Sequence, residues 1–236
     1  MKSDLRLWEI DLDQSPEWIE AASARVLAAD ERPRPGEAED QVRRRRLVAR
    51  IALRIALSRA LDRAPGELRL RRDGSGKPWL EPHDPRAPLH FNLSRTGDCC
   101  LIAVARGGPV GVDVEHVVPL PEADDIVRTR FAAEEARAIL AREGADRVRA
   151  FFNCWTRKEA YLKARGLGLM APLDHVVVTV GDEPGFVSLH DDDPRAWRLF
   201  AVPLGPDRAG AVAVRCAGSR GGGMLRPEAL PLDRGG

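Results

Sequence analysis

The feature that most constrains the fold is a long helical pattern followed by strand-like segments, an order that occurs twice along the chain. From Glu37 to about Ala60, the apolar residues Leu47, Ile51 and Ile55 recur every four residues, which predicts one long helix with an apolar stripe. Strand-like segments follow, and a second helical region is again followed by strands. Helices and strands separated in this way predict an α+β protein.

The expected elements divide the chain into two halves of similar size. Short apolar or alternating segments predict strands at 5–10, 90–93, 99–105, 110–117, 176–180, 197–202 and 209–216. Helices are predicted to begin at Ser15, which is a suitable N-cap before Pro16, and to span 132–142 and 149–165. We therefore expect an N-terminal half at 1–111, a C-terminal half at 112–216 and a mobile tail at 217–236. No clear sequence repeat relates the halves.

Composition excludes several classes of function. The 37 Lys and Arg residues balance 36 Asp and Glu residues, so no overall charge attracts nucleic acid or membrane. The charged N-terminus is not a signal peptide and no apolar run has the length of a membrane span, which predicts a cytoplasmic protein. Four cysteines without a C-x-x-C pair argue against zinc and predict packing residues.

Two carboxylates stand in the sequence G-V-D-V-E at Gly111–Glu115. Side chains alternate along a strand, so Asp113 and Glu115 are expected on one face, where they repel unless a cation lies between them. Mg²⁺ prefers such oxygen ligands. A solvent-facing strand with two unrelated acids is the alternative, and this segment alone favours that alternative.

A second charged group lies on the predicted helix at 149–165. Trp155, Glu159 and Lys163 are four residues apart and share one helical face. Glu159 and Lys163 are explained either as an exposed ion pair, worth about 0.2–0.5 kcal/mol, or as ligands of a bound metal phosphate. The tryptophan indicates that this face is partly covered, which favours the second explanation.

Basic residues offer further candidates for phosphate binding. Arginines at 43, 46, 50 and 54 form a stripe beside the apolar stripe of the first long helix. A solvated face is the alternative, and Arg54, deepest in the apolar stretch, is the best ligand candidate. Lys77 in a Gly-Lys-Pro turn and the polar end of the strand at 91–96 are weaker signals. The chain has no P-loop, no G-x-G-x-x-G and no G-x-S-x-G sequence.

Four blocks together resemble a known family. The blocks are G-K-P at 76–78, F-N-L-S-R at 91–95, G-V-D-V-E at 111–115 and W-T-R-K-E-A-Y-L-K-A-R-G-L-G-L at 155–169. In this order they resemble the 4′-phosphopantetheinyl transferase superfamily, in its larger, surfactin-synthetase-activating type. The resemblance implies a pseudo-twofold α+β fold, with two similar halves in one chain and coenzyme A in the cleft between them.

The resemblance also implies a reaction. The 4′-phosphopantetheine arm of coenzyme A passes to a serine of an apo acyl or peptidyl carrier protein, 3′,5′-ADP is released, and Mg²⁺ is required. A monomer suffices, and neither nucleic acid nor membrane is a partner. Two alternatives remain open: a catalytically silent module that binds carrier protein or coenzyme A, and a different Mg²⁺-dependent phosphotransferase or nuclease.

The family's functional residues carry over onto matching positions. Asp113, Glu115 and Glu159 match metal ligands, and Lys158 and Lys163 match active-site lysines that also contact coenzyme A. The expected ligands of coenzyme A are completed by Arg54, Lys77, Ser94 and Arg95.

Two points of the carry-over need separate comment. Arg95 replaces a histidine common in the family, and its high pKa excludes proton transfer. Glu135, four residues after Phe131, matches an additional acid near the metal. The general base is left open between Glu159, Glu135 and a metal-bound water.

Overall fold

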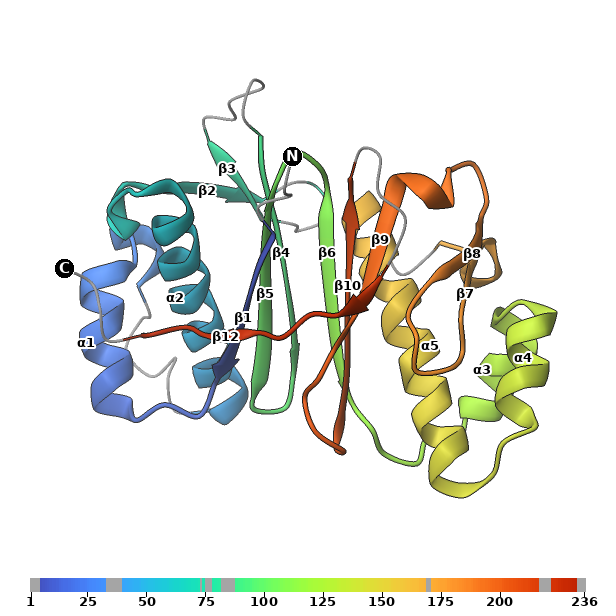
Figure 1. The fold of residues 1–236 in the computed structure, drawn as a ribbon. Coiled ribbons are helices and arrows are strands. Elements are labelled where there is room, and N and C mark those ends of the chain that lie inside the picture. Colours follow the sequence, from blue (N-terminus) through green and yellow to red (C-terminus); the bar gives the residue numbers. More distant parts are fainter. Residues whose placement is uncertain are drawn as a thin grey trace.

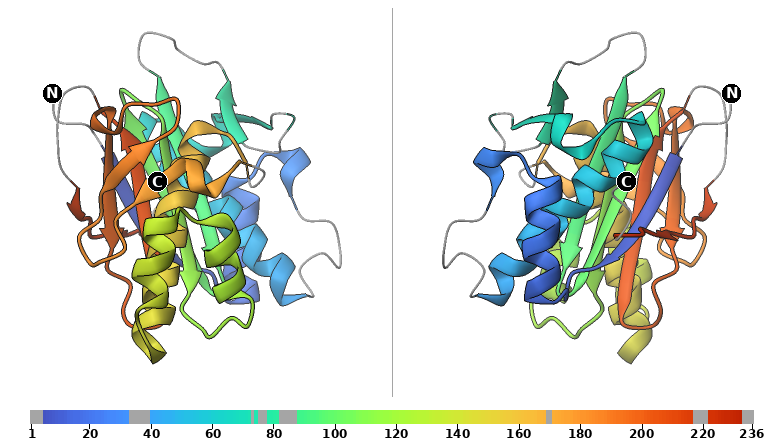
Figure 2. Two further views of the ribbon diagram at one scale, coloured as in Figure 1. Left: turned by 90° about the vertical axis from the view of Figure 1, so that its right-hand side faces the viewer. Right: turned by 90° about the vertical axis from the view of Figure 1, so that its left-hand side faces the viewer.

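The computed structural model describes residues 5–32, 40–72, 74, 78–81, 88–168, 171–216 and 222–232. Two four-stranded sheets lie next to each other in the middle of the molecule, and helices cover the outer faces of both (Figure 1). Views from the two sides show α1 and α2 in front of one sheet and the α3–α5 helices in front of the other (Figure 2). The order of layers is therefore helices, sheet, sheet, helices.

The first half confirms the predicted early elements. Ser15 caps the first helix, because its side chain accepts a hydrogen bond from the Trp18 N–H at 3.2 Å. The main sheet has the order β12-β1-β5-β4. The elements of this half are β1 (Leu5–Asp11), α1 (Pro16–Val26), α2 (Gln41–Leu61), β2 (Arg69–Arg72), β3 (Pro78–Glu81), β4 (Leu89–Thr96) and β5 (Cys99–Arg106).

The second half has a sheet of order β11-β9-β10-β6. Its long helix begins at Gly144, five residues before the predicted start, and ends before Gly166 as predicted. The elements of this half are β6 (Val110–His116), α3 (Ala123–Arg130), α4 (Ala133–Leu140), α5 (Gly144–Arg165), β7 (Val176–Val178), β8 (Phe186–Leu189), β9 (Trp197–Val202) and β10 (Arg208–Arg215).

Both halves repeat one order of elements. Each has a first strand, a helical region that ends in a long helix, a two-stranded hairpin and two more strands of the main sheet. The long helices α2 and α5 each end at a residue in the left-handed conformation, Asp62 with φ 53° and Gly166 with φ 70°. This duplication confirms the pseudo-twofold α+β fold. The predicted boundary after Gly111 falls within β6, and we propose that the halves divide just before it, in the turn between β5 and β6.

Three apolar clusters hold the layers together. One lies between α1, α2 and the first sheet, and a second lies between α5 and the second sheet. The third joins the two sheets, with Leu101, Val112 and Val212 fully buried at its centre. The predicted packing role of Cys99, Cys100 and Cys154 is confirmed, since all three are free and buried.

The C-terminal segment corrects one prediction. Residues 222–232 of the expected mobile tail are packed: β11 (Gly223–Met224) pairs with β9, and β12 (Glu228–Ala229) pairs with β1. Leu230 is buried in the first core cluster. The segment thus crosses from one sheet to the other (Figure 1). The high Gly and Pro content suggested mobility, whereas short edge pairing needs only two residues per strand.

We expect Leu230→Ala to destabilise the protein by roughly 2–5 kcal/mol, because it empties a buried site. The melting temperature should fall by at least about 4 °C. Met224→Ala is the matched control, since Met224 is 63% exposed on the same segment and should leave the melting temperature unchanged. Equal melting curves for all three proteins would show that the segment does not pack.

Sequence analysis did not predict the β2–β3 hairpin, the strand β8 or the helix α3, whereas β7 lies within the strand predicted at 176–180. The segments that were not predicted are short or rich in charge, so their periodicity is weak. Among the described residues, no helix combines the length and the apolarity needed to cross a bilayer.

Candidate active site

The site begins where α5 packs against β6. Val112 and Val114 of β6 are buried between the two sheets, so Gly111 and Asp113 face the helix. A Cβ atom at Gly111 would lie 2.0 Å from the Ala160 carbonyl oxygen and 2.4 Å from the Ala164 nitrogen. The glycine therefore allows the helix to contact the strand backbone directly.

This close packing places side chains of α5 beside the strand carboxylates. Glu159 is 5% exposed and Asp113 is 2% exposed. Lys163, one turn after Glu159, places its Nζ 2.5 Å from Asp113 Oδ1. The predicted shared face of Glu159 and Lys163 is thus turned toward β6 rather than toward solvent.

Strand β4 of the first half completes the arrangement. Ser94 donates a hydrogen bond to Asp113 Oδ1 at 2.9 Å and accepts one from Lys163 at 2.9 Å. Thr96 donates to Glu115 Oε2 at 3.4 Å, and the Asn92 side chain accepts from the Val112 N–H at 3.1 Å. The site therefore contains residues of both halves. Sequence analysis missed Asn92 and Thr96, although their even spacing from Ser94 places them on the same strand face.

The carboxylates of Asp113, Glu115 and Glu159 repel one another. Burial, followed by the negative charges of Asp113 and Glu115, raises the pKa of Glu159 to about 7, although Lys163 opposes the shift. Burial and the charge of Asp113 also raise the pKa of Glu115. The cluster lacks enough positive charge for three ionised acids.

This arrangement suits a hard divalent cation. Asp113 Oδ2 is buried and has no hydrogen-bond partner, so it has a free lone pair in a carboxylate-rich site. Across the described part of the chain, no group of three or more His, Cys, Asp or Glu side chains is placed so that it could hold a metal ion, and the Lys163 ammonium provides the positive charge beside Asp113. The donor types of the three carboxylates nevertheless fit a hard cation.

Lys158 and Glu135 do not join this cluster, which corrects their predicted roles. Lys158 is 0% exposed and donates to Glu135 at 2.7 Å, to the Leu173 carbonyl at 2.8 Å and to the Val176 carbonyl. An ammonium has three donors, so none is left for a phosphate. Glu135 is 1% exposed and also accepts from the Val178 N–H at 2.8 Å, which removes it as an acid near the metal.

Arg54 is likewise a structural residue rather than a phosphate ligand. It is 2% exposed, and its Nη1 donates to the carbonyls of Pro65 at 2.6 Å and Leu68 at 3.0 Å. Its Nε lies 2.6 Å from Glu31 Oε2. These contacts hold the turn after α2 and leave the guanidinium inaccessible. In the sequence, the position of Arg54 deep in the apolar stretch favoured it as a ligand. In the structure, this position reflects the burial of its side chain.

Arg95 and Lys77 are the two remaining predicted ligands of coenzyme A. Arg95 is exposed, and strand alternation places it on the face of β4 opposite to Ser94. Lys77 lies outside the residues that the structure describes. Of the predicted coenzyme A contacts that the structure describes, Ser94 and Lys163 are therefore the two that lie beside the carboxylates.

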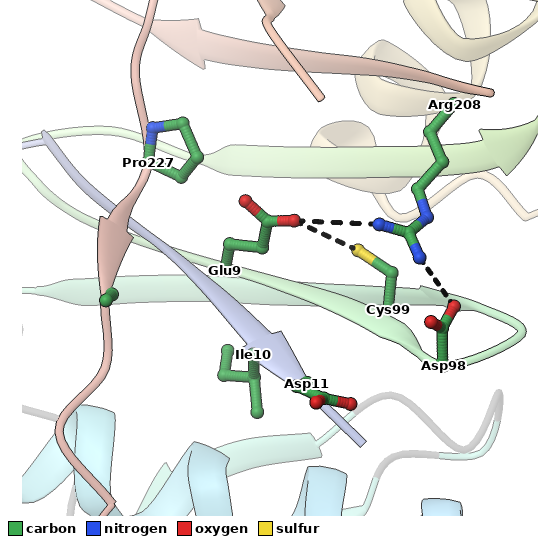
Figure 3. Close-up of a pocket in the computed structure, with 8 residues that line it drawn as sticks. Glu9, Ile10, Asp11, Asp98, Cys99, Arg208 and Pro227 are labelled. Atoms are coloured by element: carbon green, nitrogen blue, oxygen red, sulfur yellow. Dashed lines mark hydrogen bonds and ion pairs between the residues drawn. The ribbon is translucent and has the colours of Figure 1, made fainter. Parts of the chain in front are cut away.

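A separate pocket of about 500 Å³ lies between β1, β10 and the C-terminal segment (Figure 3). Arg208 points into it and contacts Asp98 at 2.6 Å and Glu9 at 3.8 Å. Burial raises the pKa of the neighbouring Cys99 thiol to about 12, so it is no nucleophile. In this pocket Arg208 is paired with two acids, whereas in the Asp113 cluster one lysine, Lys163, lies among three acids.

Comparison with known proteins supports the family resemblance of the sequence motifs that form the site. The family profile described as 4′-phosphopantetheinyl transferase superfamily matches residues 109–214, which include β6 and α5. The profile described as 4′-phosphopantetheinyl transferase, N-terminal, matches residues 16–106. The two matched regions correspond to the two halves of the fold.

Whole-protein relatives agree with the profiles. The 4′-phosphopantetheinyl transferase HetI of Nostoc sp. is 30% identical over 92% of this chain and 90% of its own. A protein of Synechocystis sp. named for the same activity is 34% identical over 71% of this chain and 68% of its own. The 4′-phosphopantetheinyl transferase Sfp of Bacillus subtilis is 30% identical over 69% of this chain and 75% of its own. The chain belongs to the 4′-phosphopantetheinyl transferase superfamily and, with two halves in one chain, to its larger type.

Proposed function

We propose that this protein transfers the 4′-phosphopantetheine arm of coenzyme A to a serine of an apo acyl or peptidyl carrier protein, with Mg²⁺ as cofactor. The observation that carries the proposal is the cluster of Asp113, Glu115, Glu159 and Lys163 at the junction of the two halves. Family membership supplies the substrate class. A silent binding module would have no use for three mutually repelling acids around one lysine.

The reaction joins the serine oxygen to the β-phosphorus of coenzyme A and breaks the bond from that phosphorus to the bridging oxygen. The leaving group is 3′,5′-ADP. Asp113, Glu115 and Glu159 are the residues that would hold Mg²⁺. When bound, Mg²⁺ would supply positive charge to the pyrophosphate oxygens, where repulsion otherwise opposes attack.

Lys163 would provide the second positive charge. Its flexible stem is 30% exposed and its ammonium already lies between Asp113 and Ser94, so a short movement suffices to reach a phosphate oxygen. The Ser94 hydroxyl lies at the same place, and it would turn from Asp113 Oδ1, to which it donates, toward a phosphate oxygen. Both residues would thus contact the leaving side of the pyrophosphate and stabilise the charge that develops there.

The serine proton needs an acceptor within the site. Of the two glutamates predicted for this role, Glu135 is buried against Lys158, whereas Glu159 faces the cluster. Glu159, directly or through a water, is therefore the residue that would receive the proton. Lys77 stays a predicted ligand of the coenzyme A phosphates.

The nucleotide product tests this proposal. The protein would be incubated with coenzyme A, Mg²⁺ and either an apo acyl or an apo peptidyl carrier protein, and 3′,5′-ADP would be measured by chromatography, with and without EDTA. We expect one 3′,5′-ADP per carrier protein, and none with EDTA. Undiminished product in EDTA would disprove the metal dependence, and no product with either carrier class would favour the silent binding module.

A further inference from the structure

A buried pair of charges lies directly behind the acidic cluster. Lys158 precedes the predicted metal ligand Glu159 on α5, and its ammonium is fully buried with Glu135 as its ionic partner. The Leu173 and Val176 carbonyls accept its other two donors. Lys158 therefore ties three segments together: α5, the start of α4 and the strand β7.

The first half contains the same arrangement without an acidic cluster. Arg54 of α2 pairs with Glu31 and donates to the carbonyls of Pro65 and Leu68, which lie in the turn after the helix. Glu31 accepts from the Ala28 N–H at 3.4 Å, as Glu135 accepts from the Ala132 N–H at 3.0 Å. Arg54 and Lys158 are 104 residues apart, and so are Glu31 and Glu135. The duplicated fold thus carries a duplicated buried ion pair.

The surroundings of the two pairs differ in one important respect. The residue after Arg54 is Ile55, which packs into the first core, whereas the residue after Lys158 is Glu159 in the acidic cluster. In the second half, Arg157 also donates to the carbonyls of Thr179 and Gly181, both at 2.7 Å. The side of α5 opposite to the cluster is therefore fastened at two consecutive residues.

The front of the same helix is held by its contact with β6. The backbone of Ala160 lies so close to Gly111 that any Cβ there would clash. The contact with Gly111 holds one side of α5 and the contacts of Lys158 hold the other. Together they fix the rotation of the helix about its axis and its position along that axis. These two quantities set where the carboxylate of Glu159 lies relative to Asp113.

We infer that Lys158 and Glu135 are positioning residues, which set the geometry of the acidic cluster without touching coenzyme A or the metal. This inference rests on the proposed metal site. Partners that orient metal ligands commonly contribute about 10–100-fold in metal affinity. Arg54 and Glu31 serve the fold of the first half in the same way but orient no acid.

The test compares Lys158→Met with Arg54→Met, because the two variants break equivalent ion pairs. Mn²⁺ would serve as the probe, with binding to the wild-type protein and each variant measured by electron paramagnetic resonance in the absence of coenzyme A. We expect Lys158→Met to weaken Mn²⁺ binding at least about 10-fold. Both variants should lower the melting temperature by similar amounts, because each breaks a buried ion pair. Arg54→Met should nevertheless keep Mn²⁺ affinity within about threefold of wild type, since it disturbs no metal ligand.

Two additional variants address folding and rescue. Lys158→Arg should restore Mn²⁺ binding to within about threefold of wild type, because Arg54 shows that a guanidinium can make the equivalent contacts. If Lys158→Met does not fold, the double variant with Glu135→Gln removes both buried charges and keeps an acceptor for the Val178 N–H. It should show the same loss of Mn²⁺ affinity.

Kinetics distinguish positioning from direct contact. A positioning role predicts a lower kcat in Lys158→Met with the KM for coenzyme A nearly unchanged. Wild-type Mn²⁺ affinity in the folded Lys158 variants, or a large rise in the KM for coenzyme A alone, would overturn the inference. Absence of Mn²⁺ binding by the wild-type protein would instead overturn the proposed metal site, and the inference with it.

Discussion

Glu159→Gln is expected to lower the rate of phosphopantetheine transfer by about 10³-fold and, at the same time, to stabilise the metal-free protein. The loss follows because an amide is a poor ligand for a hard cation and cannot accept the serine proton. A group that stabilises charge in a transition state is typically worth about 10²–10³ in kcat, and Glu159 would combine two roles. The gain in stability has a separate cause.

The gain arises from the repulsion within the cluster. Burial and the charges of Asp113 and Glu115 raise the pKa of Glu159 to about 7, well above that of an unfolded glutamate. An acid whose pKa is raised by folding stabilises the folded state below its unfolded pKa, and this contribution is lost as the pH rises through 7. At pH 8 the folded protein therefore holds an unfavourable charge, and glutamine removes it without changing the shape of the side chain.

Thermal unfolding in EDTA at pH 5 and pH 8 measures this effect. A relief of about 1 kcal/mol would raise the melting temperature of Glu159→Gln by about 2–4 °C at pH 8, and by less at pH 5. Glu134→Gln is the control, because Glu134 is exposed on the surface of α4 and should change neither quantity. A Glu159→Gln protein that melts below wild type at pH 8 would contradict the repulsion that we infer.

Gly111→Ala is expected to damage both stability and transfer. The new methyl group would meet backbone atoms of α5, at 2.0 Å from the Ala160 carbonyl oxygen and 2.4 Å from the Ala164 nitrogen. Backbone cannot rotate away as a side chain can, so the helix must move by about 1 Å. Overpacking of this kind costs about 1–3 kcal/mol, and misplacing reactive groups by about 1 Å costs about 10²-fold in rate.

The measurement pairs a urea denaturation curve with a transfer assay of the folded fraction. Gly223→Ala provides the control, because a Cβ at Gly223 has no heavy atom within 4 Å. We expect the control to behave as wild type in both assays. Normal transfer by Gly111→Ala would mean that the contact between α5 and β6 does not set the geometry of the site.

The sequence predicted the acidic cluster well because its spacing follows local rules. Alternation along a strand placed Asp113 and Glu115 on one face, and helical spacing joined Glu159 to Lys163. Side-chain burial depends instead on tertiary contacts, and three predictions were wrong for this reason. Arg54, Lys158 and Glu135 have the residue types of phosphate and metal ligands, yet each is buried and paired with residues of other segments of the chain.

A weak sequence repeat indicates which of these charged residues are equivalent in the two halves. The sequences L-A-A-D-E at 27–31 and F-A-A-E-E at 131–135 are 104 residues apart, the same separation as Arg54 and Lys158. Comparison of the two halves at this spacing would have paired Ile55 with Glu159. At this pair of positions an acid of the cluster takes the place of a buried apolar residue, whereas the buried ion pairs of Arg54 with Glu31 and of Lys158 with Glu135 occur in both halves.

The C-terminal segment shows a different limit. Its strands β11 and β12 contain two residues each, too few for any alternation to be recognised. Their pairing depends on the edges of β9 and β1, which only the assembled fold provides. Leu225, Leu230 and Leu232 were the sequence signals of packing in a segment otherwise rich in Gly, Pro and Arg.

The most direct test of the central claim is the intact mass of an apo acyl carrier protein after incubation with this protein, coenzyme A and Mg²⁺. A peptidyl carrier protein would be tested in parallel, and each carrier with its acceptor serine changed to alanine would serve as control. We expect a gain of one phosphopantetheine on a serine-containing carrier, and no gain with Asp113→Ala in place of the wild-type protein. If the folded wild-type protein binds coenzyme A but leaves both the acyl and the peptidyl carrier protein unmodified, the proposed transferase activity is contradicted.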